Sequence, residues 1–403
     1  MKVFEILTMV RSALVARTFV AAVVTGLLLM AIFGRQAAKE NVHSDFVRFT
    51  NYIGPDTKYY PTVNEMMAVV RAKAKPEQIL VIVGGNSVLY GVGQKREQVW
   101  TKALQDRLGD QYAVVNLAFR GSLVTDGGAV VAEALREEYP RQIYMANAAP
   151  TQAPTPDGSL VYRFIFWEAY HKGLLIDDPE RDAALESYNT RPPYNEGLVE
   201  LNLRLRLDRF FYFQDFWNDV TFDRLNTVWG AYFPGVTRFL EPRKVNPDPE
   251  PDLLTFPMSS RYIEANNEIE MLNVRGNSMY AFEKDPEGKW QPVAGPWTAF
   301  VNGLKGIMPE PLRKRTLILL SRTSPYYTRR LPPDEQERDN LAYERAALLW
   351  RESGYEAMDY GSDYTIDDFG DRTHLTWRGG EKLATTVAVK VKEMAAKLEY
   401  LQP

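Results

Sequence analysis

The 403-residue sequence contains no cysteine and only three histidines. Without cysteine the chain can form no disulfide, offer no thiolate nucleophile and build no cysteine-ligated metal site. The histidines, His43, His171 and His374, are too scattered to show a metal-ligand spacing. The sequence therefore predicts neither a metal nor a dissociable cofactor, and any imidazole base must be one of these three residues.

The chain also lacks an excess of positive charge. It has 48 Lys and Arg residues against 52 Asp and Glu residues, which gives a net charge of −4 at pH 7. Nucleic-acid-binding proteins need a basic face for the phosphate backbone, so we expect no nucleic-acid partner. The length is sufficient for one large domain or two ordinary ones.

One long segment lacks charge altogether. Residues Thr18–Gly34, TFVAAVVTGLLLMAIFG, lie between Arg17 and Arg35. A membrane span needs about 20 apolar residues, and the preceding turn with a snorkelling Arg17 can complete it. We expect residues 1–41 to form a cytoplasmic tail, a single-pass inner-membrane anchor and the start of a stalk. The basic residues before the span favour a periplasmic, or at least extracytoplasmic, location for the bulk of the chain.

A cleaved signal peptide is the alternative, because the segment also has a basic start and an apolar core. The sequence that follows, GRQAAKE, carries an arginine where a short polar region should lead into an Ala-x-Ala cleavage site, which favours the anchor. Both interpretations place the rest of the chain outside the cytoplasm, with His43 in a solvated stalk.

Strands and helices alternate from Gln78 onward and again after residue 315. Short β-branched and apolar runs predict buried parallel strands at Gln78–Val83, Tyr112–Phe119, Gln142–Ala148, Thr316–Ser321 and Tyr355–Tyr360. Amphipathic stretches predict helices at Arg96–Asp110, Ser122–Pro140, Asp334–Glu352 and Trp377–Leu398, with Ser122 as an N-cap. This alternation predicts an α/β fold with a parallel sheet covered by helices on both faces.

The stretch from residue 150 to 315 breaks the alternation. It contains aromatic clusters such as Tyr162–Tyr170 and an acidic, proline-rich loop at Asn246–Asp252. We interpret it as a mostly helical insertion between two parts of a sheet domain, 42–149 and 316–403. His171 follows the first aromatic cluster, and we do not expect it to act as a base.

The first predicted strand ends in Gly84-Gly85, followed by Asn86 and Ser87. Open parallel sheets bind ligands beyond the carboxyl ends of their strands, so this serine should face the ligand-binding edge. Glycines allow a sharp turn and the close approach of a substrate. A serine is a weak nucleophile unless a base removes its proton.

His374 is the best candidate for that base. It follows the last predicted strand and precedes the last predicted helix, so it belongs to the same edge as Ser87. Asp371, three residues earlier, can accept from one imidazole nitrogen and leave the other to face the serine, which is the logic of a catalytic triad. In the alternative, Asp371 or Thr376 is a simple helix cap and His374 a loop residue.

An acyl-transfer mechanism also needs hydrogen-bond donors for the oxyanion. Gly121 follows the second predicted strand and can offer its backbone N–H, and Asn147 lies at the end of the third and can offer its side-chain amide. Together with the backbone N–H of Ser87, these groups form the predicted oxyanion hole.

Further residues at this edge are candidates for substrate binding, namely Asn86, Ser324, Tyr326 and Arg329. For the last three, a proline-containing turn with solvated arginines is the alternative. A second Gly-Asn-Ser, Gly276–Ser278, follows an acidic stretch rather than a buried strand, so we expect it to be a loop without a catalytic role.

In this order, the residues resemble the SGNH (GDSL-type) hydrolase family. In that family the serine block follows the first strand, the glycine and asparagine blocks follow the next two, and Asp-x-x-His lies near the C-terminus. The matching residues are Ser87, Gly121, Asn147, Asp371 and His374. The resemblance covers residues 78–148 and 316–398 and implies a three-layer flavodoxin-like fold with ester or acyl-transfer chemistry. Two blocks depart from the family pattern. The first block reads Gly-Asn-Ser where the family usually has Gly-Asp-Ser, and the third reads Ala-Asn-Ala where the family usually has Gly-x-Asn-Asp.

With its anchor and insertion, the chain is similar to proteins that modify cell-surface polymers, such as periplasmic O-acetyltransferases of exopolysaccharides. The resemblance implies an acyl-ester donor, a carbohydrate acceptor and a membrane-bound O-acyltransferase as a partner. We therefore expect an extracytoplasmic serine esterase or O-acyltransferase. The alternatives are a lipolytic carboxylesterase, with the aromatic insertion as a lid, and a catalytically degenerate scaffold or glycan-binding protein. An intact triad geometry would favour the enzymes.

Overall fold

The computed structural model of the chain describes residues 2–38, 48, 61–159, 162–192, 203, 208, 210–218 and 260–401. The chain divides into two units. The first comprises Met1–Val42, Ile53–Asp56 and Tyr194–Arg243, and the second His43–Tyr52, Thr57–Pro193 and Lys244–Pro403. The predicted insertion is thus shared between the units. The expected loop at 246–252 and His43 lie outside the described residues.

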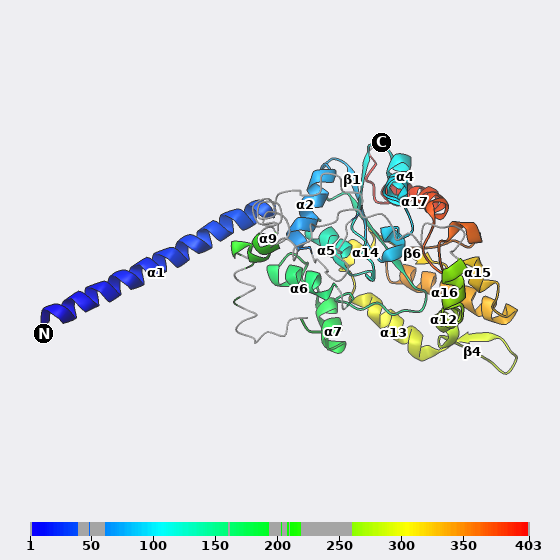
Figure 1. Cartoon of the computed structure of the whole chain (residues 1–403). Helices are drawn as coiled ribbons and strands as arrows, with labels where there is room; N and C mark the ends of the chain where they lie inside the picture. The colour runs from blue at the N-terminus through cyan, green and yellow to red at the C-terminus, as the bar shows by residue number, and fades with distance from the viewer. Residues whose placement is uncertain are drawn as a thin grey trace. The chain divides into compact units, whose positions relative to one another are not determined.

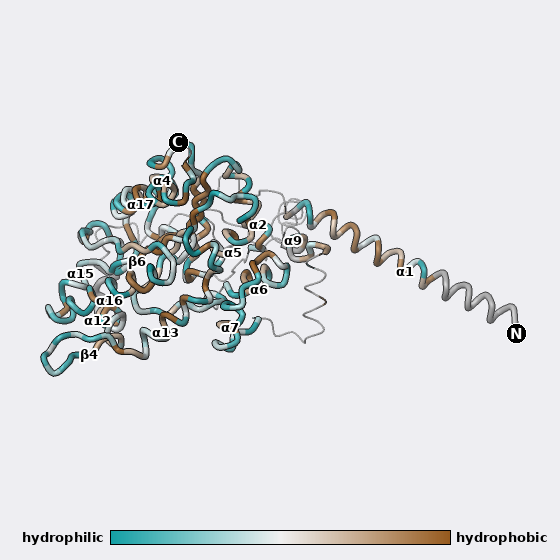
Figure 2. The backbone as a smooth tube through the Cα atoms, turned by 180° about the vertical axis from the view of Figure 1, so that it is seen from behind, coloured by the Kyte–Doolittle hydropathy of each residue, from teal (hydrophilic) through white to brown (hydrophobic). Residues whose placement is uncertain are grey.

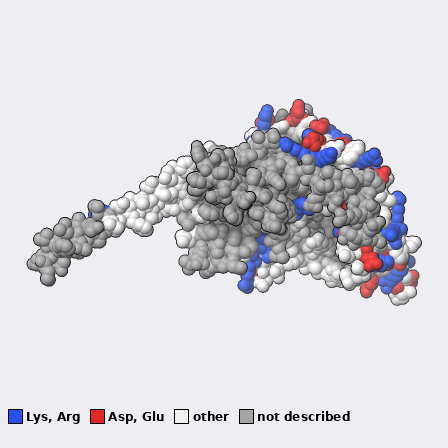
Figure 3. Space-filling model, in the orientation of Figure 1, with Lys and Arg blue, Asp and Glu red and all other residues white. Residues whose placement is uncertain are grey.

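The first unit contains a long N-terminal helix, α1 (Lys2–Ala37). Its segment Val15–Gln36 is long and apolar enough to cross a membrane and is not buried. The segment is mainly hydrophobic in Figure 2, with hydrophilic positions near its two ends, and almost free of charged side chains in Figure 3. The end of α1 contacts α9 (Phe213–Asn218). Gly34 is close to the Tyr212 backbone there, since a Cβ at Gly34 would lie 2.5 Å from the Tyr212 carbonyl oxygen.

The second unit is built on a five-stranded parallel sheet. Its strands are β1 (Ile79–Val83), β2 (Tyr112–Asn116), β3 (Gln142–Ala148), β6 (Thr316–Ser321) and β7 (Glu356–Tyr360). They follow the order β2-β1-β3-β6-β7, and all neighbours are parallel. This is the 2-1-3-4-5 order of flavodoxin-like sheets. The predicted α/β class with a parallel sheet is therefore confirmed.

Helices cover both faces of this sheet (Figure 1). They include α2 (Val63–Lys73), α4 (Trp100–Leu108), α5 (Gly127–Ala134), α16 (Pro333–Glu352) and α17 (Trp377–Lys397). On one face, Val81 and Val83 of β1 belong to the same buried cluster as Leu104 of α4 and Leu383 of α17. Side chains alternate along a strand, so Tyr144, between two β3 members of that cluster, points to the other face, where α5 packs.

The described part of residues 150–315 is mainly helical. Its elements are α6 (Arg163–Lys172), α7 (Pro179–Ser187), α9, α12 (Ser260–Met279), α13 (Ala294–Lys305), α14 (Glu310–Arg313) and the hairpin β4 (Phe282–Lys284) and β5 (Trp290–Pro292). The second Gly-Asn-Ser lies inside α12, so the prediction of a loop there was wrong. Val274 of the same helix packs in an apolar cluster, with Met271 against it, at helical spacing.

The helix predicted from Ser122 begins later, at Gly127. Ser122 is buried in the preceding turn, and Asp126 occupies the N-cap position instead. Near its start α5 packs closely on the sheet, because a Cβ at Gly128 would lie 2.8 Å from the Cα of Gly84. The first turn of α5 therefore contacts the end of β1.

A buried ion pair ties α5 of the sheet domain to α7 of the insertion. The Arg181 guanidinium lies 2.9 Å from Glu133 Oε2, and the two side chains are only 3% and 4% exposed. A second guanidinium nitrogen lies 3.1 Å from Glu133 Oε1. Glu133 also accepts from the backbone N–H of Ile176, at 2.5 Å. These bonds compensate the desolvation of both charges.

Replacing Arg181 by Met leaves the Glu133 carboxylate buried without its cation. We expect the free energy of unfolding to fall by about 3–5 kcal/mol, measured by urea denaturation of the full chain in detergent. Arg71→Met is the matched control, because the Arg71–Glu138 pair is 47% and 38% exposed and its loss should cost about 1 kcal/mol or less. Equal losses in the two variants would contradict a role for the buried pair in holding α7.

Candidate active site

The two glycines after β1 allow a close approach to β3. A Cβ at Gly84 would lie 2.4 Å from the Tyr144 hydroxyl, and one at Gly85 would lie 2.4 Å from Asn147 Oδ1. Gly85 also has a φ of +83°, a conformation that other residues rarely adopt. The glycines were expected to admit a substrate, but the atoms that approach them in the structure belong to the neighbouring strand.

This close approach lets Asn86 and Asn147 pair. The Asn86 N–H donates to Asn147 Oδ1 at 2.9 Å, and Asn147 Nδ2 donates back to Asn86 Oδ1 at 2.8 Å. Asn86 Oδ1 also accepts from the Val88 N–H at 3.0 Å, so Asn86 is the N-cap of the short helix α3 (Ser87–Tyr90). Ser87 is therefore the first residue of a helix whose start is locked to β3.

Asp371, His374 and Ser87 form a continuous hydrogen-bonded chain. Asp371 Oδ2 lies 2.5 Å from His374 Nδ1, and His374 Nε2 lies 2.8 Å from Ser87 Oγ. Asp371 Oδ1 accepts from the backbone N–H groups of Thr373 and His374, at 2.8 and 2.7 Å. The structure thus brings together the three residues that the sequence proposed for a triad. The side chains of His374 and Asp371 are 20% and 7% exposed.

The surroundings of Asp371 favour its ionised form. Burial alone would raise its pKa, but the charge of His374 and the hydrogen bonds from His374 and Thr373 outweigh it and hold the pKa of Asp371 below its usual value. An ionised carboxylate can only accept hydrogen bonds, so Nδ1 of His374 carries the proton. Nε2 is then free to accept from the hydroxyl of Ser87.

The loop that carries Asp371 and His374 is held at several points. Gly370 N–H donates to the His374 carbonyl at 2.8 Å, and Ser324 N–H donates to the Arg372 carbonyl at 2.8 Å. Thr376 caps α17 and accepts from Gly379 N–H. The helix cap considered as an alternative is thus present at Thr376, and it coexists with the Asp371–His374 pair.

Two of the predicted oxyanion donors are available. The backbone N–H groups of Ser87 and Gly121 have no hydrogen-bond partner among the described residues. Gly121 has a φ of +80°, and a Cβ added to it would meet nothing within 4 Å. The Asn147 amide is differently placed, because its Nδ2 donates to Asn86 and, at 3.3 Å, to Ser321 Oγ. In this structure Asn147 therefore holds the serine loop to β3.

The predicted substrate-binding residues have different surroundings. Ser324 is fully buried and caps the short helix α15 (Pro325–Thr328), so it positions the Asp371 loop and is not exposed to a substrate. The Asn86 oxygen is occupied by the cap and by Asn147. Tyr326 is half-buried beneath the Arg330 guanidinium. Arg329 is exposed and lines a polar cavity.

Sequence reasoning did not single out Ser321 and Tyr360, which extend the network. The Tyr360 hydroxyl donates to Ser321 Oγ at 2.7 Å, and Ser321 Oγ accepts from Asn147. Ser321 ends β6 and Tyr360 ends β7, so both lie at the carboxyl edge of the sheet. Their hydroxyl groups could have been found from that position, but their partners could not. His171, in contrast, lies beside Trp167 and Tyr170 on α6.

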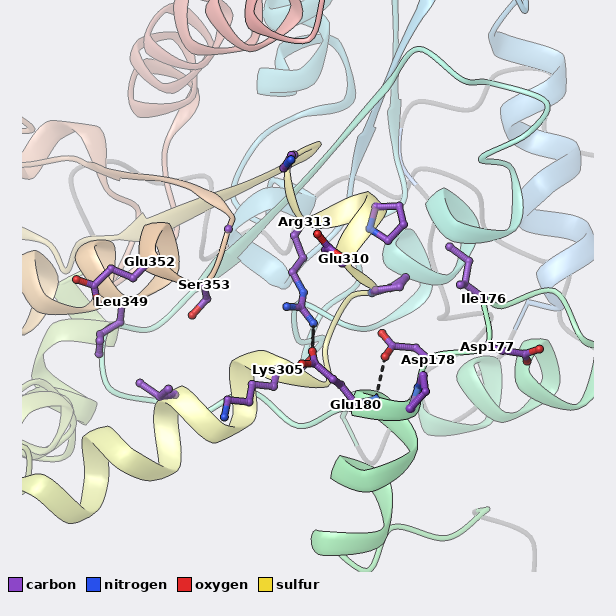
Figure 4. Close-up of a pocket in the computed structure, with 16 residues that line it drawn as sticks. Ile176, Asp177, Asp178, Glu180, Lys305, Glu310, Arg313, Leu349, Glu352 and Ser353 are labelled. Atoms are coloured by element: carbon purple, nitrogen blue, oxygen red, sulfur yellow. Dashed lines mark hydrogen bonds and ion pairs between the residues drawn. The ribbon is translucent and has the colours of Figure 1, made fainter.

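A cavity away from the triad has a volume of about 850 Å³ and lies between α7, α13, α14 and the end of α16. Figure 4 shows Arg313 pointing toward Glu180 in it, and the two are 2.5 Å apart. Arg313 and Glu352 precede β6 and β7, so this cavity lies at the amino ends of these strands, opposite the edge that carries Ser87.

Comparison with protein-family models gives no match for this chain, and no curated protein matches it significantly. The assignment of a chemistry to the site therefore depends on the geometry of the residues described above.

Gly85→Ala should disrupt the serine loop more than the backbone conformation alone explains. We expect it to lower the free energy of unfolding by about 1–3 kcal/mol more than Gly288→Ala, through the clash with Asn147. Gly288 is a matched control, because its φ is +84° and a Cβ there would meet nothing within 4 Å. Urea denaturation of both variants measures the difference. Equal decreases in the free energy of unfolding for the two variants would mean that the close approach of Gly85 to β3 does not contribute to stability.

Proposed function

We propose that the chain is a membrane-anchored, extracytoplasmic serine esterase or O-acyltransferase of the SGNH type. The observation that carries the proposal is the Ser87–His374–Asp371 chain, with heavy-atom distances of 2.8 and 2.5 Å. A nucleophile in hydrogen-bond contact with a base, itself oriented by a carboxylate, is the signature of covalent acyl transfer. The apolar helix near the N-terminus supports the anchor.

In the proposed reaction, Ser87 Oγ attacks the acyl carbonyl carbon of an ester and His374 Nε2 takes the hydroxyl proton. Asp371 holds the imidazole and stabilises its positive charge without taking the proton. His374 then protonates the leaving oxygen, which leaves an acyl group on Ser87. In the second half-reaction, His374 deprotonates water or a sugar hydroxyl, whose oxygen attacks the acyl carbon. The bond between that carbon and Ser87 Oγ then breaks, the acid or the new ester leaves, and His374 returns the proton to Ser87 Oγ.

The oxyanion would be bound chiefly by backbone donors. The N–H groups of Ser87 and Gly121 are unpaired within the described residues and need break no bond to reach it. Asn147 would join them only by giving up its 3.3 Å bond to Ser321, the longer of the two that its Nδ2 donates. Each donor of this kind contributes about 2.7–4 kcal/mol to lowering the barrier.

A fluorophosphonate probe should label the full chain in detergent at Ser87. We expect the labelling to disappear in Ser87→Ala and in His374→Ala, because the hydroxyl is reactive only when a base accepts its proton. Ser278→Ala is the matched control, since it removes the serine of the other Gly-Asn-Ser, which is buried in α12 and bonded to Arg338. Peptide mapping identifies the labelled residue. A folded wild-type chain that is not labelled would favour the non-catalytic scaffold.

Asp371→Asn tests the third member of the triad. The asparagine oxygen can keep the two backbone N–H bonds, but its NH₂ group would face Nδ1 and force the imidazole proton onto Nε2. We expect kcat for p-nitrophenyl acetate to fall by about 10⁴-fold. Asp367→Asn removes a nearby acid whose side chain is 56% exposed and should change kcat by less than about twofold. Wild-type turnover in Asp371→Asn would exclude the proposed role of Asp371.

A further inference from the structure

A smaller cavity than the one described above lies at the same edge of the sheet as Ser87. Its volume is about 360 Å³, at the lower end of the range for small-molecule sites. Its walls are the loop after β6, the loop after β7 and the beginning of α16. In the sheet order β6 is two strands from β1 and β7 is three. At about 4.8 Å per strand, these walls begin roughly 10–14 Å from the end of the strand that precedes Ser87.

The cavity is connected to the catalytic loop through its β6 wall. Ser324, between the lining residues Thr323 and Pro325, donates its N–H to the Arg372 carbonyl. Arg372 lies between Asp371 and His374 in the chain. A ligand in the cavity would thus lie against the segment that positions the loop of the proposed base.

The positive charge of Arg322, which lines the cavity, is neutralised by Asp359. Arg322 makes two bonds to Asp359 through Nε, at 2.9 and 3.0 Å, and a third through Nη2, at 2.5 Å. Its Nη1 donates to Asn340 Oδ1 at 2.5 Å. With the Arg322 charge paired, the cavity offers no excess positive charge of the kind that a phosphate group would need.

Asp339 is the unusual residue of the cavity. It lines the cavity, is only 6% exposed, and has no hydrogen bond or ion pair among the described residues. Burial raises the pKa of Asp339 to about 6, although Arg322 and Arg338 act in the opposite direction. Neither of its carboxyl oxygens is among the fully buried polar atoms that lack a partner, so both are accessible from the cavity and can accept a hydrogen bond from a ligand there.

The remaining polar groups supply both donors and acceptors. Gln336 donates Nε2 to the Leu331 carbonyl, which leaves its oxygen as an acceptor. Asn340 has its oxygen occupied by Arg322, which leaves its NH₂ group as a donor. Arg329 is exposed and adds a guanidinium. Such a mixture suits hydroxyl groups, which donate and accept, whereas a phosphate group would only accept and would meet Asp339.

We propose that this cavity binds a sugar ring of an uncharged carbohydrate, with Asp339 accepting from its hydroxyls and Arg329 and Asn340 donating to them. The role of this cavity as the acceptor subsite of an acyl transfer rests on the proposed function. Its role as a carbohydrate-binding site does not depend on that function. It would hold the chain of the acceptor while a neighbouring sugar hydroxyl reaches the acyl group on Ser87.

Binding is measured by isothermal titration of the full chain in a detergent without a sugar headgroup. The probes are the tetrasaccharides of β-1,4-linked glucose, mannose and N-acetylglucosamine. We expect at least one to bind, and its Kd to rise roughly 10- to 100-fold in Asp339→Ala and in Arg329→Ala, each of which removes a hydrogen bond to a charged group. Glu344→Gln is the control, because it removes an exposed acid of the same helix outside the cavity and should leave Kd unchanged.

If Asp339→Ala fails to fold, Arg329→Ala still tests the cavity, because Arg329 is exposed and its replacement should leave the fold intact. Absence of binding for all three probes, binding unaffected by both variants, or displacement of the sugar by inorganic phosphate would each overturn the assignment. Fluorophosphonate labelling of the same wild-type preparation separates the two proposals. If Ser87 is labelled and no sugar binds, the subsite alone is wrong. If a sugar binds through Asp339 but Ser87 is not labelled, the acceptor role is overturned and a glycan-binding site remains.

Discussion

The contact between Gly85 and Asn147 is the constraint on which the rest of the site depends. Only a residue without Cβ can bring the end of β1 this close to β3 with a φ of +83°. The approach lets Asn86 and Asn147 exchange hydrogen bonds, and that exchange fixes the first turn of α3 with Ser87 at its start. Asn147 then continues the network to Ser321 and Tyr360. Four strand ends are thus joined by polar side chains rather than left to the flexibility of their loops.

The part of the site that contains Asp371 and His374 depends on a balance between the cost of burying a carboxylate and the hydrogen bonds that the carboxylate accepts. The Asp371 carboxylate is almost completely buried, which is costly unless its charge is compensated. Two backbone N–H groups and the imidazole of His374 provide that compensation, and they also hold the ring toward Ser87. Ser87 and His374 are separated by 287 positions in the chain. The nucleophile and its base therefore meet only after the first and last strands have joined one sheet.

Two acidic side chains in different parts of the second unit, Asp339 and Glu133, differ in their hydrogen bonding. At the carboxyl edge, the Asp339 side chain has no hydrogen bond within the described residues and its oxygens face a cavity, whereas the Glu133 carboxylate is bonded to Arg181 and Ile176. A carboxylate that faces a cavity can accept a hydrogen bond from a ligand, and one that is paired inside the protein cannot do so without losing its partner. The ion pair of Glu133 thus holds α7 of the insertion to α5, and Asp339 leaves an acceptor open at the carboxyl edge.

Several features could be predicted from the sequence because their causes are local. The β-branched runs and helical periodicity predicted the parallel strands, and the position of polar residues after them predicted Ser87, Asp371 and His374 at one edge. The start of α5, the helix that contains the second Gly-Asn-Ser, the burial of Ser324 and the bonded state of Asn147 were not predictable. These features involve residues from distant parts of the chain. Examples are the close approach of Gly128 to Gly84 and the hydrogen bond from the Ser324 N–H to the Arg372 carbonyl. The sequence by itself thus determined which residues stand at the sheet edge, whereas only the tertiary structure decided which of them are hydrogen-bonded to one another and which keep a free donor or acceptor.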